Sequence, residues 1–164
     1  MGDHADQEHA EKRLFEEIEK HRQGMLGVVG GTPHHFQPMT QFLDKDDHSA
    51  LWFFTRTDTD LVRQAEQGKA MFVLQNDKFQ ACIGGRLHAA RDQAIIDKFW
   101  SPVIAAWYPE GKDDPHLTLL RFDLEDAELW LSEAGPIRFT FEVVKANLTK
   151  TTPDVGDRAH LNLN

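Results

Sequence analysis

The sequence predicts a mainly β protein of the α+β class, an antiparallel barrel or sandwich with added helices. Six consecutive elements between residues 25 and 90 are joined by links of hairpin length, which is typical of antiparallel sheets. Longer helical patterns occur only at 6–22, at 92–107 and, less clearly, at 137–150. The chain has 164 residues, of which 40% are hydrophobic, so we expect one domain over 1–164, with loosely ordered tails at 1–5 and 151–164.

The first third of the chain is predicted to form a surface helix followed by strands. In the helix at 6–22, the residues Leu14, Phe15 and Ile18 form a narrow apolar stripe on an otherwise polar surface. Strands are expected at 25–29, 36–43 and 50–56. Pro38 lies inside the second strand. Because proline cannot donate a ladder hydrogen bond, this strand should lie at a sheet edge, at a bulge or beside a ligand.

The segment at 50–68 has the most informative local pattern. The apolar and β-branched run at 51–55 predicts a strand, a polar turn follows at 56–59, and Leu61, Val62 and Ala65 predict a short helix that Gly68 ends. Thr59 is a natural N-cap for this helix. A strand, a hydroxyl-rich turn and a helix N-terminus together can bind an anion, but the local pattern alone favours the simpler role, in which Thr59 only caps a surface helix.

The second half of the chain adds strands and further helices. We expect strands at 70–74 and 79–90, with a bulge or a close approach at Gly84 and Gly85. Apolar residues at helical spacing over 92–107 predict a helix that Pro102 kinks or divides. Two strands should follow, at 116–122 and 127–131. Residues 137–150 fit either a strand or a helix, and Pro136, a good first helical residue, favours the helix.

Composition argues against several classes of partner and compartment. The net charge of −9 disfavours nucleic acid, because phosphate binding needs basic patches. No apolar run is long enough for a membrane span and the N-terminal residues lack a signal-peptide centre, so we expect a cytoplasmic protein that binds no membrane. The nine histidines show no zinc-ligand spacing, so we expect no metal site. Cys82, the single cysteine, is expected to be a small buried apolar residue.

Several motifs resemble those of a known family. The run from Phe99 to Pro115 contains W-x-P and W-x-P-x-G-K-D-D-P blocks, and Leu119-Leu120-Arg121 and Ala127-Glu128-Leu129-Trp130 follow it. Pro38-Met39-Thr40 and the strand at 51–55 also match in order and spacing. Over residues 8 to 132 the chain resembles the general stress protein 26 family, within the pyridoxamine 5′-phosphate oxidase-like flavin-binding split-barrel superfamily.

The resemblance implies an antiparallel split β-barrel with peripheral helices, forming a homodimer that binds FMN at its interface. By position, residues 38–40 would lie along the flavin ring, Phe54 and Thr55 would reach the ribityl-phosphate end, and Thr59 would sit at the phosphate. Trp100 and Trp107 lie on the segment that the resemblance places at the interface. The expected cofactor-binding residues are Gln37, Pro38, Met39, Thr40, Phe54, Thr55, Arg56, Thr59 and Trp107.

The sequence departs from the family pattern at basic positions. His35, Gln37 and Leu61 stand where the family usually has cations, and Arg56 or Arg63 would have to compensate. A missing charge-assisted bond to phosphate removes about 1.5–3 kcal/mol, so FMN, FAD, another flavin or no cofactor stay open. The resemblance implies a flavin-dependent oxidoreductase with an unassigned small-molecule substrate. The alternatives are a non-catalytic dimeric module that holds flavin, haem or another planar ligand, and a barrel whose site has decayed.

Overall fold

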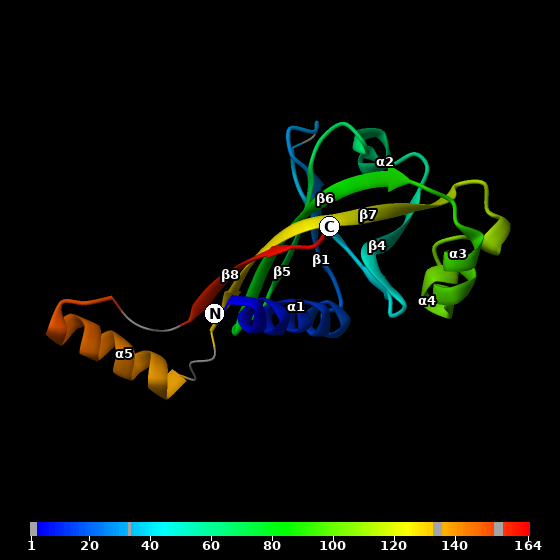
Figure 1. Cartoon of the computed structure of the whole chain (residues 1–164). Coiled ribbons are helices and arrows are strands. Elements are labelled where there is room, and N and C mark those ends of the chain that lie inside the picture. The colour runs from blue at the N-terminus through cyan, green and yellow to red at the C-terminus, as the bar shows by residue number, and fades with distance from the viewer. Residues whose placement is uncertain (1–2, 33, 133–135, 153–155) are drawn as a thin grey trace.

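A computed structural model of the chain describes residues 3–32, 34–132, 136–152 and 156–164, and in this part eight strands form one antiparallel sheet (Figure 1). The strand order is β2-β1-β5-β6-β7-β4-β3, and β8 pairs with β7 beside this path. The strands are β1 (Gly24–Val28), β2 (Gln37–Met39), β3 (Phe42–Asp44), β4 (Asp47–Arg56), β5 (Ala70–Gln75), β6 (Phe79–Ala89), β7 (Leu117–Leu131) and β8 (Asp157–Asn162).

The two ends of the strand order meet, which makes the sheet a split barrel. Strands β2 and β3 lie at opposite ends of the order, yet only Thr40 and Gln41 separate them in the chain. Three residue steps span at most about 11 Å, so the sheet must curl until its two edges approach. The predicted single strand at 36–43 was therefore wrong, because its two halves pair with different partners. Pro38 does lie in an edge strand, as predicted.

Strand β7 is the longest strand and forms the centre of one side of the barrel. Its first half pairs with β4 and its second half with β8, while β6 pairs along its other edge. The sequence predicted two strands with a break at 123–126, but the strand continues through these residues.

The tail after residue 150 was predicted to be loose, and this is wrong for β8, which places Leu161 in the core at 1% exposure. The register shift between Gly84 and Gly85 confirms the predicted bulge in β6.

Two apolar clusters hold the fold. The first fills the barrel and includes Leu14 and Ile18 from the apolar stripe of α1 (Asp3–Lys20), which covers one side of the barrel. This helix already begins at Asp3, so the prediction of a loose start at 1–5 was wrong for residues 3–5, while residues 1–2 lie outside the described part of the chain. The second cluster lies outside the barrel, where Trp52 and Leu119 of the sheet pack against Ile96 and its helical neighbours.

The remaining helices match their predictions. Pro102 separates α3 (Gln93–Phe99) from α4 (Pro102–Ala105), and α2 (Asp60–Gln64) follows β4. Helix α5 (Pro136–Thr149) confirms the helical interpretation of 137–150 and projects away from the barrel (Figure 1). Among the described residues, no helix has the length and apolar character that crossing a membrane would require.

Candidate functional site: a groove between β4 and α4

A groove of about 540 Å³ lies between the end of β4, the chain that joins β2 to β3, and helix α4 with its following loop. This volume is in the range of sites for small molecules and cofactors. The groove is lined by Pro38, Met39, Thr40, Phe42, Phe54, Thr55, Arg56, Thr59, Ser101, Val103, Ile104, Trp107 and Tyr108.

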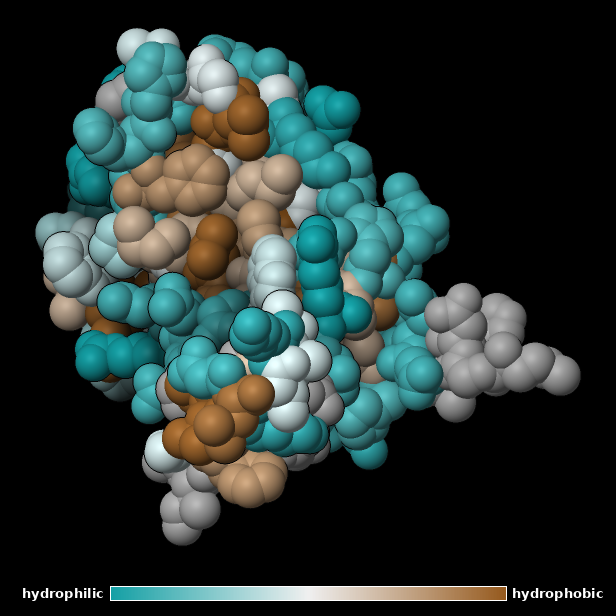
Figure 2. Space-filling view, turned by 90° about the vertical axis from the view of Figure 1, so that its left-hand side faces the viewer, coloured by the Kyte–Doolittle hydropathy of each residue, from teal (hydrophilic) through white to brown (hydrophobic). Residues whose placement is uncertain are grey.

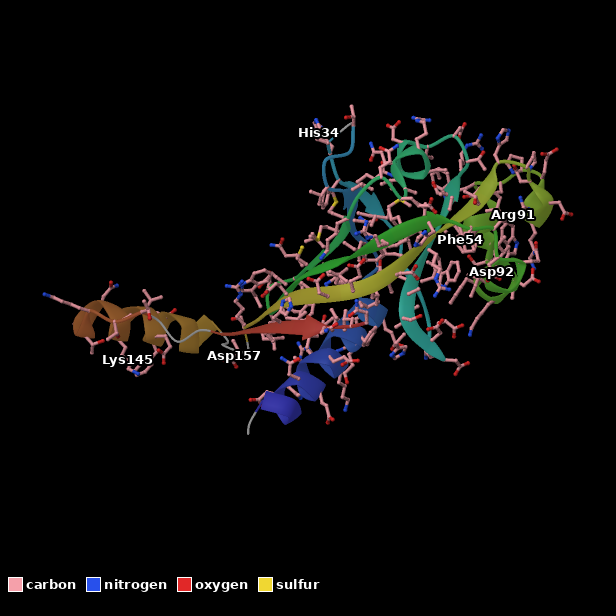
Figure 3. The ribbon with its side chains drawn as sticks, turned by 45° about the horizontal axis from the view of Figure 1, so that its top comes forward. His34, Phe54, Arg91, Asp92, Lys145 and Asp157 are labelled. Atoms are coloured by element: carbon pink, nitrogen blue, oxygen red, sulfur yellow. The ribbon has the colours of Figure 1, made fainter. Side chains whose placement is uncertain are left out.

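Strand alternation explains how β4 supplies the groove. Successive side chains of a strand point to opposite faces. Leu51 and Phe53 therefore belong to the barrel core, whereas Trp52 and Phe54 belong to the outer cluster with the helices. Figure 3 shows Phe54 on the side of the sheet that faces α3 and α4. The aromatic run that predicted a strand thus divides its side chains between the core and the groove.

Aromatic side chains build one wall of the groove. The rings of Phe42 and Phe54 meet edge to face, with centroids 5.4 Å apart at 76°. Trp100 packs behind this wall, 6.4 Å from the Phe54 ring and 6.3 Å from the Tyr108 ring. Of the two tryptophans considered for the site, Trp107 lines the groove and Trp100 supports its wall.

Hydroxyl groups form a polar end of the groove where β4 runs into the turn before α2. The Thr59 hydroxyl donates to the carbonyl oxygen of Arg56 at 3.1 Å, and the hydroxyl oxygens of Thr55 and Thr59 lie 3.3 Å apart. Thr59 is the N-cap residue of α2 in backbone conformation, but its side chain makes no capping hydrogen bond. The predicted position of Thr59 is therefore confirmed, and the predicted side-chain cap is wrong because the hydroxyl is used within the turn.

Arg56 brings positive charge to this end, but a carboxylate accompanies it. The Arg56 Nε donates to Asp58 Oδ1 at 3.3 Å, and this hydrogen bond lowers the pKa of Asp58. Arg63, the other cation considered as compensation, donates to the Asp58 carbonyl oxygen at 2.8 Å and pairs with the Asp60 carboxylate. Arg63 does not line the groove, so Arg56 is the cation that this lining offers.

Tyr108 fixes the groove to the barrel. Its hydroxyl donates to the carbonyl oxygen of Thr55 at 2.9 Å, so the loop after α4 is tied to the end of β4. Burial raises the pKa of Tyr108 to about 12. Arg56 and Tyr108 are the ionisable side chains of the lining; a guanidinium only donates hydrogen bonds, and the Tyr108 phenol keeps its proton near neutral pH. The groove can therefore bind, orient and shield a ligand, but its lining supplies no general base.

The structure brings together eight of the nine predicted site residues, all but Gln37. Gln37 directs its side-chain amide to Met39 Sδ at 3.6 Å and does not line the groove. His35 is exposed and also lies outside the lining, and Figure 3 shows its neighbour His34 on a loop remote from Phe54. Leu61 is 3% exposed in the barrel core. A lysine or arginine side chain at this position would therefore have to extend out of the core to bring its charge to the groove.

Sequence reasoning did not identify Phe42, Ser101, Val103, Ile104 and Tyr108 as site residues. A signal for Ser101 was present, because a serine before proline at a helix start is a typical N-cap, and its Oγ accepts from the Ile104 backbone N at 3.3 Å.

Cys82 is half-buried rather than buried, and burial raises the pKa of its thiol. In the described part of the chain, no three His, Cys, Asp or Glu side chains are grouped to hold a metal.

Comparisons with known proteins agree with this architecture. The family model of the pyridoxamine 5′-phosphate oxidase like proteins matches residues 9–154. The chain is 24% identical over 131 residues to general stress protein 26 of Bacillus subtilis strain 168, covering 75% of this chain and 89% of that protein.

Solved structures extend the comparison. A protein of Jannaschia sp. CCS1 assigned as general stress protein 26 has 35% identity and a TM-score of 0.75, covering 93% of this chain and 98% of that chain. The general stress FMN/FAD binding protein of Xanthomonas citri has 34% identity and a TM-score of 0.69, covering 76% of this chain and 89% of that chain. The split barrel, its strand order and these matches show that the chain belongs to the pyridoxamine 5′-phosphate oxidase-like family.

Proposed function

We propose that this chain binds FMN in the groove between β4 and α4 and serves as a flavin-dependent oxidoreductase. The observation that carries the proposal is the groove's division into an aromatic wall and a hydroxyl-bearing end, which suits a flat ring with a polar chain. The name of the Xanthomonas citri relative, an FMN/FAD binding protein at 34% identity, supports a flavin as the ligand.

Each part of the groove has a role in this proposal. Residues 38–40, Phe42 and Phe54 would hold the ring system, and the hydroxyls of Thr55 and Thr59 would hold the polar chain. Ile104 and Trp107 would exclude water from the ring. A bound flavin would supply the hydride or electron chemistry, while the chain would orient the ring and determine the polarity of its surroundings.

A second candidate function has its own support. A guanidinium has no lone pair to act as a base and the Tyr108 phenol keeps its proton near neutral pH, so the lining offers no acid–base pair to a substrate. A module that holds flavin without turnover needs no such pair. Reduction of the bound flavin by a physiological donor distinguishes the oxidoreductase from this holding module.

We also propose that two copies pair as a homodimer. Val103 and Trp107, at the rim of the groove, are each 74% exposed, which is unusual for large apolar side chains. The side from which α5 projects also shows gathered apolar side chains (Figure 2). On α5, Phe141, Val144 and Leu148 are exposed at helical spacing, and a helix this short is marginal without a packing partner. Pairing would remove these surfaces from water.

The test is to load the purified protein with FMN, remove the excess, and add NADH or NADPH without oxygen. A perturbed flavin spectrum that bleaches faster than free FMN supports the oxidoreductase. Retained flavin that neither donor reduces favours the holding module. Protein that retains no flavin contradicts both. Light scattering of the same sample should give the mass of two chains, and a mass of one chain would contradict the homodimer.

A further inference from the structure

We infer that Asp58 masks Arg56, so that the groove recognises a flavin by its ring and ribityl chain and discriminates only weakly between FMN and riboflavin. This inference rests on the proposed flavin site. It assigns Asp58, which does not line the groove, as the residue that sets selectivity for the terminal phosphate.

The first support is the charge at the polar end. A phosphate dianion usually meets several cations or a well-formed set of N–H donors. Here the lining carries one cation, Arg56, whose Nε lies 3.3 Å from an Asp58 carboxylate oxygen. The Asp58 carboxylate, held against Arg56 just outside the lining, repels a phosphate that Arg56 would attract, so it largely offsets that attraction.

The neighbouring cation does not change this balance. Arg63 is engaged twice, with the Asp58 carbonyl oxygen at 2.8 Å and with the carboxylate of Asp60. Arg56 thus pairs with Asp58 in the turn before α2, and Arg63 pairs with Asp60 within α2 itself. Arg63, held in these contacts outside the lining, therefore does not replace Arg56 as a partner for the phosphate.

The second support is the use of hydroxyl protons. The Thr59 hydroxyl donates to the Arg56 carbonyl oxygen, so its proton is committed within the turn. Thr55 Oγ1 lies 3.3 Å from Thr59 Oγ1 and is then the donor of that pair. A hydroxyl whose proton is committed presents only lone pairs to a ligand. Lone pairs accept from the O–H groups of a ribityl chain but repel the oxygens of a phosphate.

The experiment measures dissociation constants for FMN and riboflavin by quenching of flavin fluorescence, in the unaltered protein, Asp58→Asn and Asp60→Asn. The unaltered protein should prefer FMN by less than about tenfold. Asp58→Asn should raise that preference about tenfold by tightening FMN alone, because one freed charge-assisted bond is worth about this factor. Asp60→Asn removes the same charge two residues away and releases Arg63, which lies outside the lining, so it is the matched control for general charge and should leave the preference unchanged.

The outcomes separate the inference from the proposed function. A preference for FMN beyond about tenfold in the unaltered protein, or an Asp58→Asn protein with an unchanged preference, overturns the masking role while leaving the flavin site intact. An equal gain in Asp60→Asn also overturns it, because the effect would then be general charge rather than a masked arginine. Failure of both flavins to bind overturns the proposed function itself.

Discussion

Replacing Trp107 by alanine should weaken FMN binding about twenty- to thirtyfold without lowering the stability of the fold. Trp107 is 74% exposed at the rim of the groove. A tryptophan side chain offers about 200 Å², so about 150 Å² is open, and a flat ring covering half of this removes about 75 Å² from water. At about 25 cal/mol per Å², the covered area contributes about 2 kcal/mol, which corresponds to that change in the dissociation constant.

The assay is a fluorescence titration with FMN, combined with thermal unfolding of each protein without ligand. Trp130→Ala is the matched control, because Trp130 is 41% exposed on β7, lies under Arg158 and is not part of the groove lining. Light scattering at the titration concentration reports whether Trp107→Ala also changes the association of chains. Equal FMN affinity in Trp107→Ala and the unaltered protein would refute the reasoning, and so would an equal loss in Trp130→Ala.

Four further predictions concern Tyr108 beside the groove and two positions in the sheet. Tyr108→Phe should lower the free energy of unfolding by about 1 kcal/mol at pH 7 in urea titrations, because the hydrogen bond to Thr55 is lost; an unchanged value would contradict this role. Burial raises the pKa of Tyr108 from near 10 to about 12, so the neutral phenol stabilises the fold below about pH 10. That contribution should disappear between about pH 10 and 12, giving the unaltered protein a steeper loss of stability there than Tyr108→Phe. Leu161→Ala should lower the free energy of unfolding by about 2–5 kcal/mol in the same titrations, whereas a negligible change would show that β8 is not anchored. Gly85→Ala should lower the melting temperature by scanning calorimetry, because its Cβ would lie 2.0 Å from the Asp123 carbonyl oxygen, and an unchanged melting temperature would contradict the close approach.

Local patterns were sufficient where an element is determined by its own residues. The helical spacing over 92–107 and the position of Pro102 predicted the pair α3 and α4. The strand, turn and helix at 50–68 were recognised from side-chain type alone, and they form one side of the groove. The bulge at Gly84 followed from glycine within a strand.

Predictions failed where pairing with distant residues decides the structure. Residues 36–43 look like one strand, but β2 pairs with β1 and β3 pairs with β4, so the chain crosses the barrel opening between them. The polar run at 123–126 resembles a turn. In β7 it stays extended because β6 pairs along it, with Arg86 opposite Asp123, Gly85 opposite Leu124 and Gly84 opposite Asp126. Strand β8 was missed because its polar sequence carries few apolar residues before Leu161.

The site predictions likewise succeeded where neighbouring residues decide the structure and failed where distant residues or the shape of a turn decide it. The local pattern predicted Thr59 as the N-cap residue of α2, and its backbone takes that position, while the side-chain cap assigned to Thr59 was wrong because a bond to Arg56 competes for the hydroxyl. Tyr108 was treated as part of a loop, since nothing in its neighbours indicates that it reaches across to β4. The pairing of Arg56 with Asp58 depends on the shape of the turn, so its effect on ligand charge was not visible in the sequence.

The measurement that tests the central proposal most directly is the visible absorption spectrum of the purified protein after FMN is added and the excess is removed. The proposed site predicts one bound flavin per chain, with a spectrum shifted from that of free FMN by the aromatic wall at Phe42 and Phe54. A protein that stays colourless at an FMN concentration of about 1 mM, with riboflavin retained no better, would contradict a flavin site in this groove.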